Sequence, residues 1–251
     1  MESKVATAHQ TVAAILESSK RSSLPLRHSF VQKPGRSAGQ GPLAEFVRTH
    51  NNRGLDQYLL FHAAASAPPY NVARHSKIWA RALGLGQSVS STAAVSKTWA
   101  WLIRNGLVAK GRRGRISSPT LLREDGSRKP YKHPSEKSER YFQIPYEFWL
   151  DSKRWYQRLD LPAKAVLLIA LSLDDGFVLP AEHAQKWYGV SADTVGRGLR
   201  RLVDEGLLKR VRVRKVAPLA PDGFTWESHY TLLPPFGPRG RKKRRSKKGS
   251  G

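Results

Sequence analysis

Two segments of the chain, 100 residues apart, place apolar residues at the same positions. The segments run from Ser91 to Lys110 and from Ser191 to Arg210. Each opens with a serine, has apolar residues four, eight, eleven and twelve positions later, and reaches a glycine that two apolar residues follow. This spacing is typical of a helix that buries one face and then gives way to a strand. Because an internal repeat indicates repeated structural units, we predict two copies of a helix-then-strand unit.

The pattern around the first segment predicts three helices followed by a hairpin. Ser91 is expected to cap the third helix and Gly106 to end it in the left-handed conformation. Trp101 would point outward from this helix, and we expect it to pack against the hairpin or the other unit rather than lie bare. The predicted elements are helices over 55–65 and 76–83, a third helix between Ser91 and Gly106, a strand over 107–110, a turn over 111–114 and a returning strand over 115–122.

The second segment belongs to a similar series of predicted elements. Ser191 should cap its third helix, with Asp193 favourably placed near the positive end of the helix dipole. The hairpin that follows alternates arginine with valine, so we expect one exposed and one buried face. The elements are a helix over 162–173, a turn over 174–176, a short strand over 177–179, a helix over 181–188 that stops at Gly189, the third helix, and a hairpin over 209–232 with its break at 218–223.

The rest of the chain yields weaker predictions. We expect little structure in residues 1–50 beyond one short helix around Val12. An aromatic-rich segment around Phe148 and Trp149 should pack on the second unit or bridge the two, and it could offer a surface to a second copy or another protein. The predicted organisation is a poorly ordered segment over 1–50, a first domain over 51–125, a linker over 126–140, a second domain over 141–236 and a disordered basic tail over 237–251.

Composition limits what such a chain can do. The 251 residues carry a formal net charge of +25, and nucleic acid is the commonest polyanion that such a field attracts. The absence of cysteine excludes disulfides and thiolate zinc sites, and the eight histidines lack metal-site spacing. We therefore expect no metal and no cofactor. The longest apolar run, over 165–173, is too short to cross a bilayer, and no signal-peptide region opens the sequence, so we expect no membrane contact and a cytoplasmic, nucleoid-associated location.

Catalytic motifs are lacking. Asp174 and Asp175 are adjacent carboxylates, but a pair that precedes a glycine is more typical of a turn. Gly84 and Gly86 lack the downstream glycine and lysine of a phosphate-binding loop. We predict that the protein is not an enzyme.

The positive charge is unevenly distributed. No Asp or Glu occurs from Gln57 to Arg123, a stretch that holds ten basic residues. The C-terminal tail is expected to act as a mobile basic arm. Its basic residues are Arg241, Lys242, Lys243, Arg244, Arg245, Lys247 and Lys248.

The order of helix, short strand, helix, tight turn, helix and hairpin resembles winged helix-turn-helix domains. The second copy carries the resemblance most clearly, through residues 187–195 and 202–208. The resemblance covers about 55–122 and 141–233, and about five extra residues, 86–90, lengthen the inter-helix turn of the first copy. It implies that the third helix of each unit enters the major groove and that the hairpin, or wing, touches the backbone or minor groove. Tandem domains of this kind resemble transcriptional regulators and the replication initiators of plasmids and phages.

Helical geometry then nominates the side chains that would face DNA. In the second copy the apolar set points one way, and Arg197 and Arg201 lie one turn apart on the opposite face. The alternative is a solvated face on which Arg200 and Arg201 pair with Asp204 or Glu205. The candidate contacts are Lys97 and Arg104 on the first helix, Arg112, Arg113 and Arg115 on its hairpin, Thr194, Arg197, Arg200 and Arg201 on the second helix, and Arg210, Arg212 and Arg214 on its hairpin.

The sequence therefore predicts a mainly α, α+β protein with two winged helix-turn-helix domains that binds double-stranded DNA. If both third helices enter one face of the duplex, their subsites would lie about 10 base pairs apart. Two other functions stay open: a basic protein that coats nucleic acid without sequence preference, and an RNA-binding protein.

Overall fold

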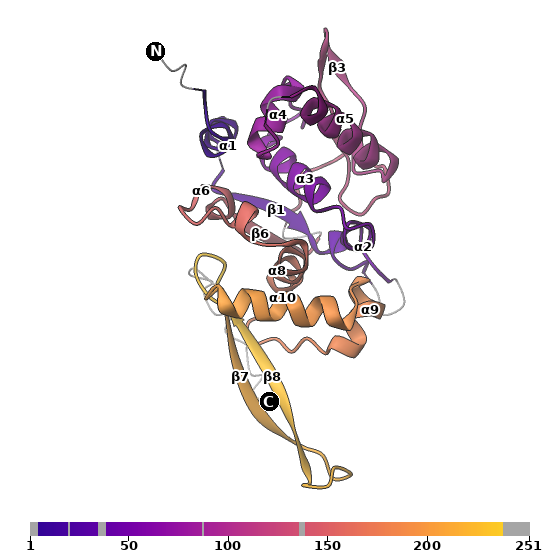
Figure 1. Cartoon of the computed structure of the whole chain (residues 1–251). Coiled ribbons are helices and arrows are strands. Elements are labelled where there is room, and N and C mark those ends of the chain that lie inside the picture. The colour runs from indigo at the N-terminus through magenta and orange to yellow at the C-terminus, as the bar shows by residue number, and fades with distance from the viewer. Residues whose placement is uncertain (1–4, 20, 35–38, 87, 136–138, 238–251) are drawn as a thin grey trace, which may run out of the picture.

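The computed structural model describes residues 5–19, 21–34, 39–86, 88–135 and 139–237. These form an α+β fold in which helices predominate and the strands pair only as small two-stranded antiparallel sheets (Figure 1). The helices are α1 (Ala8–Glu17), a 3-10 turn η1 (His28–Phe30), α2 (Leu43–Arg48), α3 (Asn52–Ala64), α4 (Ser76–Ala82), α5 (Val89–Arg104), α6 (Glu147–Leu150), α7 (Trp155–Arg158), α8 (Leu161–Ser172), α9 (Ala181–Tyr188) and α10 (Ala192–Asp204). The strands are β1 (Ser23–Arg27), β2 (Val108–Ala109), β3 (Arg112–Arg113), β4 (Ile116–Ser117), β5 (Thr120–Leu121), β6 (Tyr141–Pro145), β7 (Leu208–Val216) and β8 (Phe224–Leu232).

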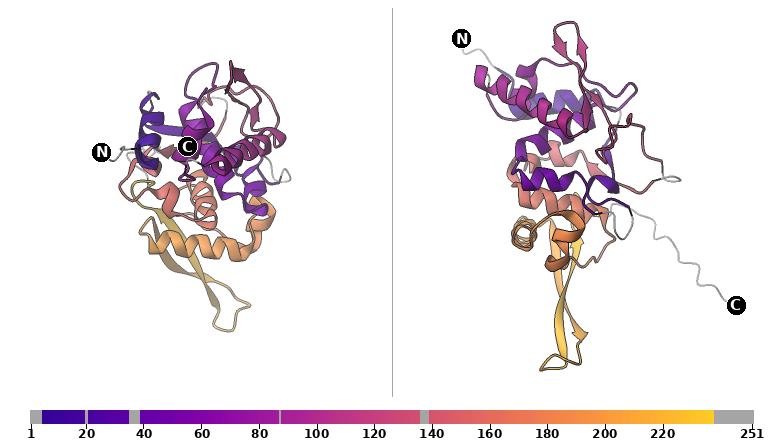
Figure 2. Two further views of the ribbon diagram at one scale, coloured as in Figure 1. Left: turned by 45° about the horizontal axis from the view of Figure 1, so that its top comes forward. Right: turned by 90° about the vertical axis from the view of Figure 1, so that its right-hand side faces the viewer.

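The repeated segments form two units of similar order. The first unit is α3, α4 and α5 followed by β2–β5, and the second is α8, α9 and α10 followed by β7–β8. We call β3–β4 the first hairpin and β7–β8 the second hairpin. The two hairpins extend from opposite ends of the molecule, and α3 and α8 lie between them (Figures 1 and 2).

One hydrophobic core runs through both units. Its buried side chains come from α1 and β1 as well as from the helices of each unit. Between the units, the Lys164 ammonium of α8 donates to both carboxylate oxygens of Asp56 on α3, at 2.6 and 2.8 Å, and to Asn52 Oδ1 at 3.0 Å. Burial raises the pKa of Asp56 to about 6, against the opposing effect of Lys164. The first helices of the two units are thus joined by a buried ion pair.

The N-terminal segment is ordered where little structure was expected. Helix α1 begins with a capping box in which Thr7 and Gln10 each bond the other's backbone, and it buries Val12 in the core as the predicted short helix would. Strand β1 pairs antiparallel with β6, and Leu24 and Leu26 are fully buried. The expectation is wrong because the apolar residues of this segment find their partners far along the chain, as Leu24 does opposite Ile144 and Phe46 does against Trp101.

The segment predicted to link the units is held by ion pairs. The Arg27 guanidinium of β1 bonds the buried Glu124 carboxylate at 2.5 Å and also bonds Glu139. Arg123 bonds the other oxygen of Glu139 at 2.5 Å, and Tyr131 lies buried under the Arg27 guanidinium. Both ends of this segment are therefore tied to β1, through Glu124 and Glu139.

The aromatic segment around α6 belongs to the core. Phe148 and Trp149 are buried, and the Phe148 ring packs edge-on against Trp149 at 5.0 Å and against Phe236 at 6.2 Å. The segment packs on the second unit as expected, but the prediction that it offers a surface to a partner is wrong because these rings are inaccessible. Within the described ranges, no helix is long and apolar enough to span a bilayer.

Candidate nucleic-acid interface

Helix α10 has one exposed face, a clear N-terminal cap and a close contact with α8. Ser191 caps it, as predicted, by accepting from the Thr194 backbone N–H at 3.2 Å, and Gly189 ends α9 at φ +67°. Gly198 faces α8: a Cβ there would lie 2.5 Å from the Pro162 carbonyl oxygen. Gly196 has nothing within 4 Å of the same position. Gly198 therefore allows the close approach of α10 to α8, whereas Gly196 leaves open space beside the helix backbone.

The predicted basic side chains of α10 are exposed and differ in their partners. Arg197 pairs with Asp193 at 3.1 Å across one turn, and both side chains are more than half exposed. Arg201 bonds Glu205 at 2.9 Å and also donates to the Arg158 carbonyl oxygen at 3.2 Å. Glu205 is nearly buried between Arg201 and Arg158, so Arg201 helps to fix the end of α10. The alternative interpretation, pairing with Glu205, therefore holds for Arg201.

Two further candidates on α10 differ in accessibility. Arg200 is exposed, and it lies on the helix beside Arg201. Thr194 is half-buried, and its hydroxyl lies 2.9 Å from the Ser191 hydroxyl. The threonine is therefore engaged in the cap, and Arg197 and Arg200 are the cations of this helix that the rest of the fold leaves most accessible.

The second hairpin projects from the body with both faces exposed beyond its base. The register pairs Leu208 with Leu232 in the core, and then Arg210 with Tyr230, Arg212 with Ser228 and Arg214 with Trp226 on the same face. Val211 and Val213 lie on the opposite face and are nearly half exposed. The predicted buried valine face is wrong: the face that enters the core at the base is the one that carries the arginines.

Aromatic rings explain how those arginines lie side by side. The Arg212 guanidinium lies 5.0 Å from the centre of the Trp226 ring, and that of Arg214 lies 4.6 Å from Phe224 and 5.5 Å from Trp226. Stacking on a ring face favours a cation and leaves its N–H edges open. Among the described residues, no carboxylate pairs with Arg210, Arg212 or Arg214. The sequence predicted the arginines as contacts but not their ring partners, because only the register places Trp226 opposite Arg214 and Phe224 diagonally across from it.

In the first unit, α5 starts earlier than predicted. Ser88 is the cap, accepting from the Ser91 backbone N–H at 3.2 Å, while Ser91 lies inside the helix and its hydroxyl donates to the Leu85 carbonyl. Several serines precede the helix, and the cap falls on the one whose backbone is extended. Gly106 adopts φ +70° as predicted.

The outward face of α5 is only partly basic. Lys97 and Arg104 are exposed. Trp101 packs as expected rather than lying bare, but its partner is Phe46 of α2, at 4.6 Å between ring centres, and neither the hairpin nor the second unit. The N-terminal segment thus covers one edge of the surface that α5 could offer.

The first hairpin presents exposed arginines beside a groove. Arg112 and Arg113 lie in β3, and the turn is formed by Gly114 and Arg115 rather than by 111–114. Gly111 lies outside the turn. A glycine is needed there because a Cβ would lie 2.2 Å from the Ser118 carbonyl oxygen.

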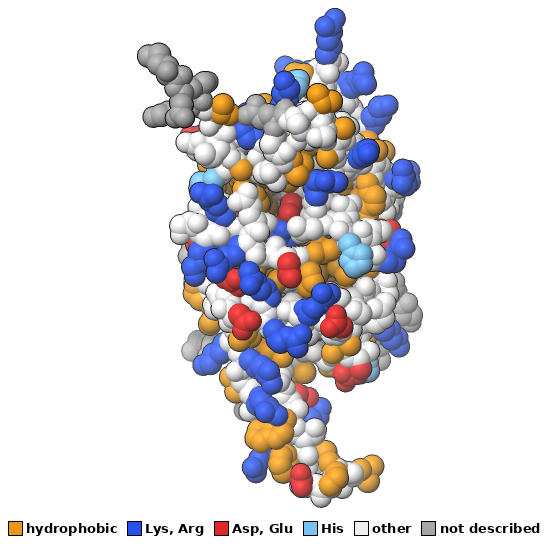
Figure 3. Space-filling model, viewed as in Figure 1, with side chains coloured by type: hydrophobic (Ala, Val, Ile, Leu, Met, Phe, Trp, Pro, Cys, Tyr) orange, Lys and Arg blue, Asp and Glu red, His pale blue; other side chains and the backbone are white. Residues whose placement is uncertain are grey.

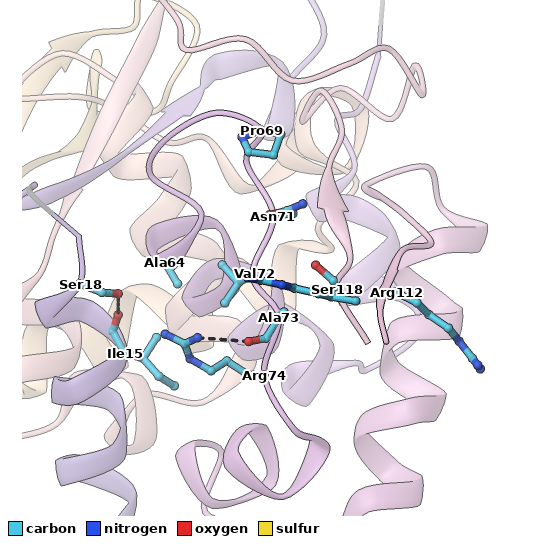
Figure 4. Close-up of a pocket in the computed structure, with 11 residues that line it drawn as sticks. Ile15, Ser18, Ala64, Pro69, Asn71, Val72, Ala73, Arg74, Arg112 and Ser118 are labelled. Carbon is cyan, nitrogen blue, oxygen red and sulfur yellow. Dashed lines mark hydrogen bonds between the residues drawn. The ribbon is translucent and has the colours of Figure 1, made fainter. Parts of the chain in front are cut away.

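The groove of about 570 Å³ lies between this hairpin, the end of α1 and residues 69–74. Its cations are Arg74, Arg112 and Arg113. Figure 4 shows Arg112 pointing away from the other residues of the groove, whereas the Arg74 guanidinium turns back to the Ala73 carbonyl oxygen, at 3.1 Å. A phosphate in this groove would require both guanidiniums to turn toward it. Arg74 was not among the contacts predicted from the sequence.

Lys and Arg side chains occur along the whole face seen in Figure 3, from the first hairpin to the second. Apolar side chains gather toward the tip of the second hairpin. The predicted basic tail, 237–251, lies outside the described residues except for Gly237. Within the part of the chain that the structure describes, no cluster of His, Asp and Glu could hold a metal ion.

Comparisons with protein-family models, curated proteins and solved structures find no match. Any function must therefore be argued from the residues and geometry of this chain.

Proposed function

We propose that the protein binds double-stranded DNA, and that its two units are winged helix-turn-helix domains. In each, the third helix, α5 or α10, would meet the major groove while the hairpin contacts the adjacent backbone or minor groove. The protein would act without catalysis, as a transcriptional regulator or a replication initiator.

One observation is the main support for the proposal: a helix with exposed arginines and an open glycine is followed by a hairpin whose arginines have no carboxylate partner in the described parts of the chain. On α10 these are Arg197, Arg200 and Gly196. A helix that approaches base edges needs small residues and bidentate donors on its outer face. A hairpin that follows the backbone needs cations that are free to meet phosphates.

The energies favour release of Arg197 to DNA. Its exposed i,i+4 pair with Asp193 is worth about 0.3–0.5 kcal/mol, whereas a bidentate contact with guanine discriminates by about 1–3 kcal/mol. The guanidinium therefore gains more from a base than it loses from the carboxylate. Asp193 would weaken the interface, because its negative charge would repel an approaching phosphate.

We place the duplex along the long direction of the molecule. Because the hairpins extend from opposite ends (Figure 1), a duplex in this direction would pass the first unit and then the second. The second unit, with its regular turn and arginine-bearing helix, would select bases. The first, with Trp101 turned to Phe46, would hold the backbone through its hairpin and the adjacent groove.

Selection of bound sequences from a random duplex pool tests this function. One extended motif is the expected result, whereas recovery of random sequences would support coating of nucleic acid, and preference for RNA over duplex DNA would contradict the proposal.

The selected site then serves to test Arg197. Arg197→Ala should weaken binding to the site by about 1–3 kcal/mol and leave binding to random DNA nearly unchanged. Arg48→Ala is the matched control, because Arg48 is also an exposed arginine in an ion pair within its helix, with Glu45 on α2. Asp193→Asn should tighten binding. Equal losses on both substrates for Arg197→Ala would refute the base contact.

A further inference from the structure

The tip of the second hairpin is an exposed apolar surface on a rigid support. Leu219 is fully exposed, Val216 is 82% exposed and Trp226 is 48% exposed. Pro218, Ala220 and Pro221 complete the loop between the strands. No described side chain covers Leu219.

Backbone hydrogen bonds hold this loop in shape. Ala220 N–H bonds the Ala217 carbonyl, Gly223 N–H bonds the Ala220 carbonyl, and Ala217 N–H bonds the Gly223 carbonyl, each at 2.9 Å. Two prolines restrict the same residues further. A loop that is already ordered loses little conformational entropy when it binds. The loop is therefore preorganised to present Leu219 to a partner.

The hairpin that carries the tip is long and cationic. Nine-residue strands extend about 30 Å, close to the length of one helical turn of DNA, about 34 Å. A hairpin that starts beside α10 in the major groove can therefore cross the backbone to the neighbouring minor groove. The stacked arginines would meet phosphates along the way.

Acidic groups do not prevent this approach. Glu227 lies on the opposite face of the hairpin, where it pairs with Lys215 at 2.8 Å and His229 at 3.1 Å. Asp222 is the one carboxylate of the loop at 217–223, and it is exposed to water. The positive charge of the three arginines on the approaching face exceeds the single negative charge of Asp222.

We propose that the tip is a wedge: it enters the minor groove beside the site of α10, Leu219 inserts between two base pairs, and the DNA bends. Apolar side chains inserted in this way partly unstack a base step and kink the duplex, and the bend brings more of the duplex against the protein. The inference rests on the proposed function, since it requires α10 and the hairpin to bind DNA.

The test uses the full chain and its selected duplex. One set of duplexes carries 2-aminopurine, whose emission rises when stacking is lost, at successive steps beside the α10 site. A second set carries a donor and an acceptor at its ends, so that energy transfer reports bending. The wild-type protein should raise the emission at one step and increase the energy transfer.

Leu219→Ala should lose both signals while the affinity falls less than tenfold, and Leu219→Met, which keeps an apolar side chain of similar length, should retain them. Leu150→Ala, the same change at a partly exposed leucine of α6, is the control and should behave as the wild type. Wild-type binding without either signal, or signals that survive Leu219→Ala, would overturn the wedge and leave DNA binding intact. Absence of duplex binding by the wild type in a mobility-shift assay would overturn the proposed function itself.

Discussion

Two buried ionisable groups should make the stability of the protein depend on pH in opposite directions. His62 is fully buried between Tyr58 and Tyr131, and burial lowers its pKa from 6.5 to about 3. Below pH 6.5 the unfolded chain binds a proton that the folded chain does not, so stability falls as the pH falls toward 3. Between pH 7 and pH 5 this linkage costs about 2 kcal/mol.

Asp56 has the opposite sign. Its pKa is raised from 3.8 to about 6 by burial, so in the range between these values the folded chain binds a proton that the unfolded chain does not. Stability therefore rises as the pH falls through 6, by about 1 kcal/mol between pH 7 and pH 5. The two effects partly cancel in the wild type, and removal of either group should reveal the other.

Urea unfolding followed by tryptophan fluorescence at pH 7 and pH 5 measures the two contributions. His62→Phe should become more stable at pH 5, relative to pH 7, than the wild type by about 2 kcal/mol. Asp56→Asn combined with Lys164→Met, which removes the buried pair without leaving an unpaired charge, should shift the difference by about 1 kcal/mol the other way. The reasoning fails if His62→Phe shows the wild-type difference between the two pH values.

Four further outcomes are expected. Gly196→Ala should raise the free energy of unfolding by up to about 1 kcal/mol, because nothing lies near its Cβ, and should weaken DNA binding if bases come close. Gly198→Ala should instead destabilise the protein, because its Cβ would meet the α8 backbone; a chemical-denaturation curve distinguishes them. Arg27→Met should cost about 3–5 kcal/mol by leaving Glu124 buried without its partner, an effect measured in the same way. Deletion of residues 240–251 should reduce the slope of log affinity against log salt without changing the selected motif, and an unchanged slope would show that the tail does not contact DNA.

The second unit was predictable because its signals are local. Ser191 directly precedes α10, Gly189 ends α9 in the left-handed conformation, and α8 is apolar apart from Lys164 and Ser172. Each boundary is therefore determined within a few residues. In the first unit the same kind of signal is ambiguous, since Ser88 and Ser91 both stand where a cap could form, and the backbone decides between them.

Pairings across long distances could not be predicted. Strand β1 has only five residues, one of them a proline, so its own sequence does not predict a strand. Its pairing with β6 stabilises the extended conformation. Likewise, alternation along β7 gives two faces but not which of them meets the core; the register with β8 settles this by placing Leu208 opposite Leu232. The aromatic partners of Arg212 and Arg214 follow from the same register.

The pairing of β1 with β6 has a consequence for synthesis of the protein on the ribosome. Tyr141 follows Arg27 by 114 residues, and at elongation rates of about 5–20 residues per second β1 waits on the order of 6–20 s for its partner. During that interval Leu24 and Leu26 have no strand to cover them, and for most of it the Arg27 guanidinium lacks both of its carboxylates, because Glu124 and Glu139 are made only near its end. The first unit therefore emerges with its edge open, and translation of β6 is the step that closes it.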